Sequence, residues 1–351
     1  MTISSRAEPK PPVGVIDSLS TGFEIVASHI GLVLFPALLD LFLWLGPQLA
    51  IYPLRQKLAE FVMRAQLTEA ANAPGVQVIM TLLRILGERI NNIFGFLSTA
   101  PLGVPVLMTA RSTDTNSGGP LLILTDDSSL AFITLVIGFS ILGLLLGTIY
   151  FVIIARLLDD RNKFSLRTLI GRVLKNWARL TALGVIWVML GILLALMFIF
   201  VYGLCELLLI VLKGILPLAL EIGPTAVAWS QLIVGTVGLW LLILLAFSVH
   251  GMVLKNRGVL GSIWDSVQLV NWNFLSVVRL FLLAYLITIG LNYVWTLPDP
   301  DSWMRLLSIG GHAFISTGLV AATFVFYKDR YRWWTEMREW LMTQNKMLIG
   351  K

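Results

Sequence analysis

The segment from Arg156 to Arg179 constrains this chain most, because it places seven Lys and Arg residues between two apolar runs that are each long enough to cross a bilayer. Short loops this rich in cations stay on the cytoplasmic side of a membrane. Once the segment is placed inside, every other apolar run has one orientation that lets the chain pass in and out without a contradiction. The positions of the cations therefore predict the topology.

The composition assigns the chain to the integral membrane proteins. Hydrophobic residues make up 57% of the 351 residues and charged residues 13%, with a mean hydropathy of +0.84, whereas a soluble domain has roughly 25% charged residues. Cations retained on the inner face explain the net charge of +6, so no nucleic-acid partner is expected. The single cysteine, Cys205, lies in an apolar run and excludes an intramolecular disulfide and a thiolate cluster. We expect no cofactor.

The apolar runs predict an all-α, polytopic helix bundle of about six spans with both termini in the cytoplasm. Residues 1–13 are expected to form a disordered cytoplasmic leader, and residues 14–351 a single membrane domain. This domain would include an external helical region at 53–128, an external interfacial or re-entrant piece at 205–222 and a basic cytoplasmic tail at 328–351. The spans are expected at about residues 30–52, 130–154, 181–204, 226–249, 275–295 and 306–327.

Asp40 is the candidate functional residue within the membrane. It lies near the centre of the first span, between Pro36 and Pro47. A charge at that depth is costly unless it is protonated, paired or hydrated, and intramembrane acids mark functional sites by default. The sequence offers Asp40 no obvious partner. The alternative interpretation is a carboxyl that hydrogen-bonds a neighbouring helix and has no further role.

Three amphipathic helices are expected on the inner face, each followed by a pair of spans, at residues 15–30, 164–180 and 258–275. Because all three begin inside, they would form a threefold parallel repeat. The small residues Gly22, Gly171 and Ser266 share one column of this alignment. The second helix is the most basic, and its candidate contacts for anionic lipids of the cytoplasmic leaflet are Arg167, Arg172, Lys175 and Arg179.

The segment GVLGSIWDSVQLVNWNF resembles the corresponding part of uncharacterised six-helix bacterial membrane proteins related to the membrane domain of glycerophosphodiester phosphodiesterases. The matching positions are Gly258, Val259, Ser266, Asn273 and Phe274. The likeness in topology covers most of the chain, and the likeness in motif covers this segment. The soluble catalytic domain attached in some members has no counterpart here. The resemblance therefore implies a membrane module and not a phosphodiesterase activity.

The sequence contains none of the common signatures of catalysis. No P-loop, G-x-G-x-x-G, H-E-x-x-H or G-x-S-x-G stretch occurs, and His29, His250 and His312 share no ligand spacing. We therefore expect a non-enzymatic module of the bacterial plasma membrane that handles lipid or a small solute. The alternative is an accessory or scaffold subunit that docks a membrane protein partner, and a homo-oligomer also fits. An enzyme is the third hypothesis.

Overall fold

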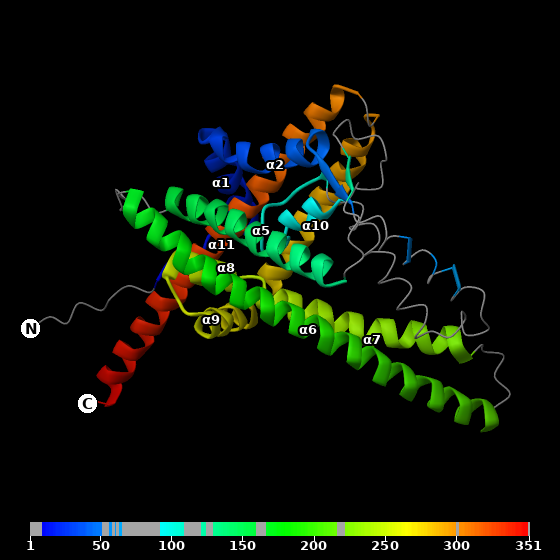
Figure 1. Cartoon of the computed structure of the whole chain (residues 1–351). Helices are drawn as coiled ribbons and strands as arrows, with labels where there is room; N and C mark the ends of the chain where they lie inside the picture. The colour runs from blue at the N-terminus through cyan, green and yellow to red at the C-terminus, as the bar shows by residue number, and fades with distance from the viewer. Residues whose placement is uncertain are drawn as a thin grey trace, which may run out of the picture.

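The computed structural model describes residues 9–50, 56–57, 60, 63–64, 92–108, 121–123, 129–158, 166–215, 222–299 and 302–349. These residues are mostly helical, which confirms the predicted helical class (Figure 1). Most of the leader at 1–13 and of the external region at 53–128 lies outside the described residues. Two short strands, β1 (Gln48–Ala50) and β2 (Leu121–Ile123), pair in parallel with Gln48 opposite Leu121. The helices are α1 (Val15–Ser28), η1 (Ile30–Leu32), α2 (Leu34–Leu45), η3 (Ile93–Leu97), α5 (Ser129–Leu157), α6 (Leu166–Ile215), α7 (Ile222–Leu245), α8 (Ser248–Lys255), α9 (Val259–Trp272), α10 (Phe274–Thr296) and α11 (Met304–Ile349).

Five helical segments of the described chain are long and apolar enough to cross a membrane, in agreement with the predicted number of about six if one bent pair is counted as well. The five are α5, α6, α7 with α8, α10 and α11. The bent pair joins α1 to the segment Ile30–Leu45 at an angle of 91°. The bend falls at His29, whose backbone leaves the helical region with φ −131° and ψ 60°.

The first predicted span, residues 30–52, is covered in the structure by η1, α2 and β1 rather than by one helix. Helix α2 ends at Leu45 because Gly46 is extended and precedes Pro47, which disfavours helical geometry in the residue before it. The 12 residues of α2 span only about 18 Å. This helix is therefore too short to cross the roughly 30 Å of hydrocarbon alone.

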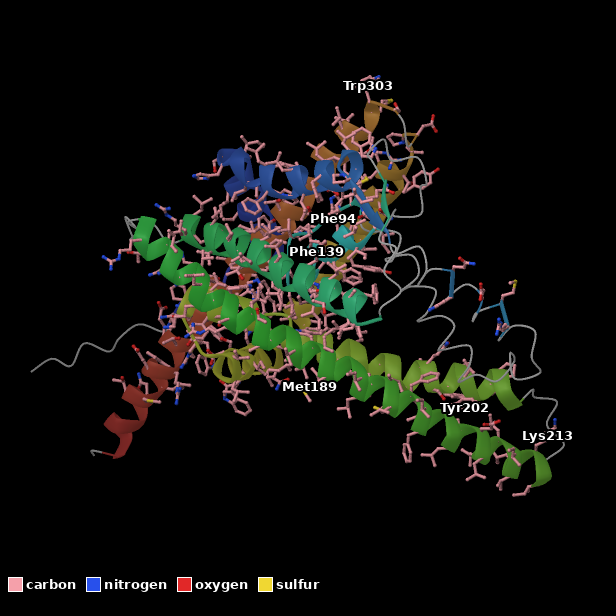
Figure 2. All side chains as sticks on the ribbon, viewed as in Figure 1. Phe94, Phe139, Met189, Tyr202, Lys213 and Trp303 are labelled. Carbon is pink, nitrogen blue, oxygen red and sulfur yellow. The ribbon has the colours of Figure 1, made fainter. Side chains whose placement is uncertain are left out.

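The basic helix predicted at 164–180 and the span predicted at 181–204 form one continuous helix, α6. This helix continues past residue 205 to Ile215 without a break. Its 50 residues measure about 75 Å. With α7 it forms a hairpin that projects from the body of the molecule, and Met189, Tyr202 and Lys213 lie along it (Figure 2). The apolar side chains of its outer half are largely exposed.

Helix α11 is the central helix, and α1 packs closely along it. A Cβ atom at Gly22 would lie 2.5 Å from the backbone nitrogen of Ala322, so only glycine permits this approach. Val26 of α1 and Ala321 and Phe324 of α11 belong to the main core. The predicted interfacial helix at 15–30 is therefore packed against the bundle on its Ser18, Gly22 and Val26 face.

Several helices bury polar residues and expose apolar ones. On α9, Ser262, Asp265 and Ser266 are buried, while Leu260 and Trp264 are exposed. On α2, the buried Asp40 contrasts with the exposed Leu34, Leu38 and Leu45. Apolar side chains of both helices are buried as well, among them Leu39 and Leu269, so what is unusual for a water-soluble protein is the combination of buried polar and exposed large apolar residues.

Candidate functional site

Asp40 is fully buried and its carboxylate is fixed by two backbone amides. Leu107 N–H donates to Oδ2 at 3.1 Å and Met108 N–H donates to Oδ1 at 2.8 Å. Both amides come from the segment that follows η3, so the carboxylate ties that segment to α2. Each carboxylate oxygen of this buried side chain thus has a backbone hydrogen-bond donor. The sequence identified Asp40 but not these partners.

The third group at Asp40 is His312 of α11. Its Nδ1 lies 3.7 Å from Asp40 Oδ2, so the two form an ion pair when the imidazole is protonated. Arg305 lies seven residues earlier on the same helix, which places both side chains on one face, and its Nη1 is 3.8 Å from the sulfur of Met108. The structure thus gathers Asp40, His312 and Arg305 around one short segment of chain.

A series of buried polar side chains continues along α11 from this cluster. Tyr150 of α5 and Thr317 of α11 are buried, and neither hydroxyl has a hydrogen-bond partner among the described residues. Further along, His250 Nε2 lies 2.9 Å from Thr323 Oγ1. Tyr327 is the next buried member, and its hydroxyl has no hydrogen-bond partner among the described residues. The series lies within the bundle, because Tyr150, Thr317 and Tyr327 are almost completely buried.

This polar series is as long as a bilayer is thick. Arg305 begins it and Arg330, also buried, ends it. The 25 residue steps from Arg305 to Arg330 correspond to about 37 Å of α-helix, compared with roughly 30 Å of hydrocarbon. Polar groups therefore follow α11 over a distance sufficient to cross a membrane.

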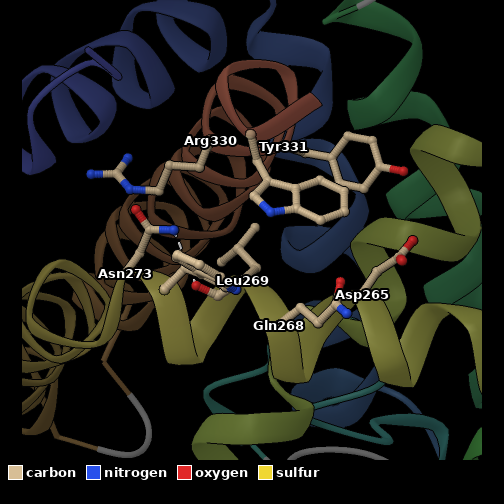
Figure 3. A pocket seen from close by; sticks show the side chains of 8 residues that line it. Asp265, Gln268, Leu269, Asn273, Arg330 and Tyr331 are labelled. Carbon is tan, nitrogen blue, oxygen red and sulfur yellow. Dashed lines mark hydrogen bonds between the residues drawn. The ribbon is translucent and has the colours of Figure 1, made fainter. Parts of the chain in front are cut away.

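The Arg330 end of the series contains a small pocket between α9, α10 and α11 (Figure 3). Arg257 Nε lies 3.1 Å from Asp265 Oδ2, and Arg257 Nη2 donates to the Tyr331 hydroxyl at 3.3 Å. The hydrogen bond to Tyr331, followed by the charge of Asp265, raises the pKa of Arg257. The Arg257 cation is therefore held by α9 and α11 together.

The four predicted lipid contacts differ in their surroundings. Arg167, Arg172 and Lys175 are exposed on the first turns of α6. Arg179 is partly buried and donates to Asn256 Oδ1 at 2.8 Å. Asn256 ends α8 in the left-handed conformation with φ 52°. Arg179 thus connects α6 to the end of α8, whereas the other three face outward.

In comparisons with known proteins, no family model, no curated protein and no solved structure matches the chain. Within the described residues, no group of three or more His, Cys, Asp and Glu side chains is placed to hold a metal ion. The fold and the site define a helical protein whose apolar helices are compatible with multiple membrane passes.

Proposed function

We propose that this protein is a non-enzymatic module of the bacterial plasma membrane that passes protons or a small polar solute along α11. Exposed large apolar side chains on α2 and α9, such as Leu38 and Trp264, support immersion in lipid, because there they are not in contact with water. The buried polar series from Arg305 to Arg330 is the observation that carries the transport role.

The proposed orientation keeps both termini in the cytoplasm. The end of α5, the start of α6, α9 and the final part of α11 gather at one end of the bundle (Figure 1). Arg156, Arg167 and Lys328 belong to these segments, and Lys255 ends α8, which precedes α9. Clustering of cations at one end is what the positive-inside rule expects of the cytoplasmic face.

In the proposed mechanism, Asp40 and His312 form the outer gate of the path. The two amide donors hold the Asp40 carboxylate in place, 3.7 Å from His312 Nδ1, so a proton on that ring would complete an ion pair. Protonation and release at His312 would alternately make and break the ion pair. The hydroxyls of Tyr150, Thr317 and Thr323 and the His250 ring continue the path inward, and groups of this type form proton relays in membrane proteins.

The test is flux into liposomes that contain the purified protein and a pH-sensitive dye. We expect Asp40→Asn and His312→Gln each to abolish most of the acid-driven signal, and the double variant to lose no more than either single one. Glu24→Gln, which neutralises an exposed acid on α1, is the matched control and should leave the signal unchanged. Wild-type flux in the Asp40→Asn variant would remove Asp40 from the mechanism.

A scaffold role is the second candidate, and the final part of α11 favours it. The helix continues past Trp334 to Ile349 and projects from the bundle (Figure 1). Leu341 and Met342 are exposed on it, although an isolated helix needs packing for its stability. Mass spectrometry of the protein purified in mild detergent at native expression tests this role, because recovery of the monomer alone would argue against a docked partner.

A further inference from the structure

The segment at residues 92–108 follows α5 from its outer part toward its centre. It begins with η3, which packs along α5. The ring centroid of Phe94 lies 5.0 Å from that of Phe139 on α5 (Figure 2). The Leu97 carbonyl then lies against Gly143, four residues further along the same helix. The chain therefore advances along α5, away from the end at which that helix begins.

A compact turn after η3 reaches Gly147, one helical turn further still. A Cβ atom at Gly147 would lie 2.6 Å from the Cα of Gly103 and 2.9 Å from the carbonyl oxygen of Leu102. The Ser98 hydroxyl donates to the carbonyl oxygen of Val104 at 3.1 Å and so closes the turn. The absence of a side chain at residue 147 is what lets this backbone lie on α5.

The position of this turn along α5 sets its depth. Gly147 lies about 27 Å from the beginning of α5 at Ser129 and about 15 Å from its end at Leu157. Helix α5 is long and apolar enough to cross a membrane. When α5 crosses a bilayer, the turn therefore lies beyond the middle of the helix.

The segment then returns to the place where it began. Phe94 packs against the cluster that contains Leu107 and Met108, so the two ends of the segment lie together. The amides of Leu107 and Met108 donate to Asp40. The Met108 sulfur lies 3.8 Å from Nη1 of Arg305, the second residue of α11. The segment therefore enters and leaves the bundle at one end.

The composition of this segment suits the interior of a membrane. Its 17 residues, from Asn92 to Met108, include no charged side chain. Leu102 and Val104 are buried in the main core, and the exposed residues of the turn are Ala100 and Pro101. Backbone that is not helical is accepted at membrane depth where protein surrounds it.

We propose that residues 92–108 form a re-entrant loop, which enters the membrane beside the outer part of α5, passes the middle of that helix and returns to Asp40. This inference rests on the proposed immersion of α5 in lipid and not on the passage of protons. It moves residues 92–108 from the external region predicted at 53–128 into the membrane. The Asp40 carboxylate becomes the tether of the returning limb, so the proposed outer gate is built on a loop within the bilayer.

The test is the depth of spin labels, measured by electron paramagnetic resonance on the full-length protein in liposomes. In a Cys205→Ala background, a nitroxide is attached at Ala100→Cys on the turn, at Leu142→Cys near the middle of α5, or at Leu130→Cys near its start. All three positions are exposed. Collisions with oxygen report the bilayer core, and collisions with a water-soluble nickel chelate report water. We expect the oxygen-to-nickel ratio at residue 100 to match that at residue 142 and to exceed that at residue 130.

Gly147→Leu provides a second measurement, because its side chain would occupy the place of the turn. We expect it to shift the label at residue 100 toward the nickel chelate and to leave the label at residue 142 unchanged. Gly138→Leu is the matched control on the same helix, since nothing lies within 4 Å of its Cβ position. It should change neither label.

The two depths also separate the loop from the membrane proposal beneath it. A shallow label at residue 100 beside a deep label at residue 142 would overturn the re-entrant loop and leave the immersion of α5 standing. Shallow labels at both positions would overturn the immersion and the loop together. If Gly147→Leu does not fold, the comparison of residues 100, 142 and 130 in the wild-type loop still decides the proposal.

Discussion

Gly22 of α1 and Ala322 of α11 meet backbone to backbone, and this contact holds the N-terminal helix on the central helix. A Cβ at residue 22 would lie 2.6 Å from the Ala322 Cα and 2.7 Å from its Cβ. None of these atoms is at the end of a flexible side chain. The two helices would have to separate to accept any other residue.

Gly22→Ala is therefore expected to destabilise the protein by about 1–3 kcal/mol, the usual cost of overpacking. Gly171→Ala is the control, since that helical glycine has nothing within 4 Å of its Cβ position. The control should be neutral or up to about 1 kcal/mol more stable, because alanine favours a helix. Thermal unfolding in detergent, followed by circular dichroism, measures both. Equal stability of the two variants would argue against the tight contact.

Asp40 is expected to matter for stability as well as for flux. Asp40→Leu would leave the amides of Leu107 and Met108 buried without an acceptor, at about 1–3 kcal/mol for each unsatisfied group. Asp40→Asn keeps one acceptor oxygen and should lose less. Hydrogen exchange at these two amides reports the effect locally. Faster exchange in the leucine variant than in the asparagine variant is the expected order, and unchanged exchange in both would contradict it.

The α7–α8 junction depends on Ser266 of α9. Its hydroxyl accepts from the Phe247 amide at 3.1 Å and donates to the Leu244 carbonyl at 2.6 Å, so it satisfies backbone groups where the helix is interrupted. We expect Ser266→Ala to cost about 1–3 kcal/mol, since the amide is then left buried without a partner. Ser20→Ala removes an exposed hydroxyl as the control. Indistinguishable unfolding temperatures for the two variants would show that water replaces the hydroxyl.

The sequence predicted the helical class and the approximate number of span-length helices, because length and hydropathy decide both. It did not predict the continuity of α6 past residue 205. Glu206 and Lys213 lower the hydropathy but have good helix propensity, and proline first occurs at Pro217.

The three small residues that the predicted repeat aligns have different surroundings in the structure. Gly22 contacts Ala322 and Ser266 bonds the backbone of α7 and α8, whereas Gly171 faces open space. Shared residue size at three positions therefore did not indicate shared packing. The threefold repeat itself stays a prediction.

The sequence did not identify His312 as the partner of Asp40. His312 lies far from it in the chain, and an apolar run indicates depth in the membrane but not which helices are neighbours. The one available signal was that both residues are ionisable and stand in apolar runs. Contacts between distant segments, such as that of Met108 with Asp40, depend on tertiary packing that hydropathy does not encode.

The proposed orientation predicts which helix ends are reached by a reagent from outside the cell. In a Cys205→Ala background, Trp303→Cys places a thiol on the exposed turn between α10 and α11, at the outer end of the molecule (Figure 2). Arg167→Cys places one on the exposed start of α6. A membrane-impermeant maleimide applied to intact cells should label the first and not the second, because the clustered cations keep the start of α6 inside.

Permeabilised cells provide the control for this labelling, since both thiols should then react. Labelling of the residue 167 thiol in intact cells would invert the topology. The Asp40 and His312 pair would then lie toward the cytoplasm, and the Arg330 pocket would face the outer leaflet, because α11 carries both sites at opposite ends of one helix. One measurement thus fixes the direction of the proposed path.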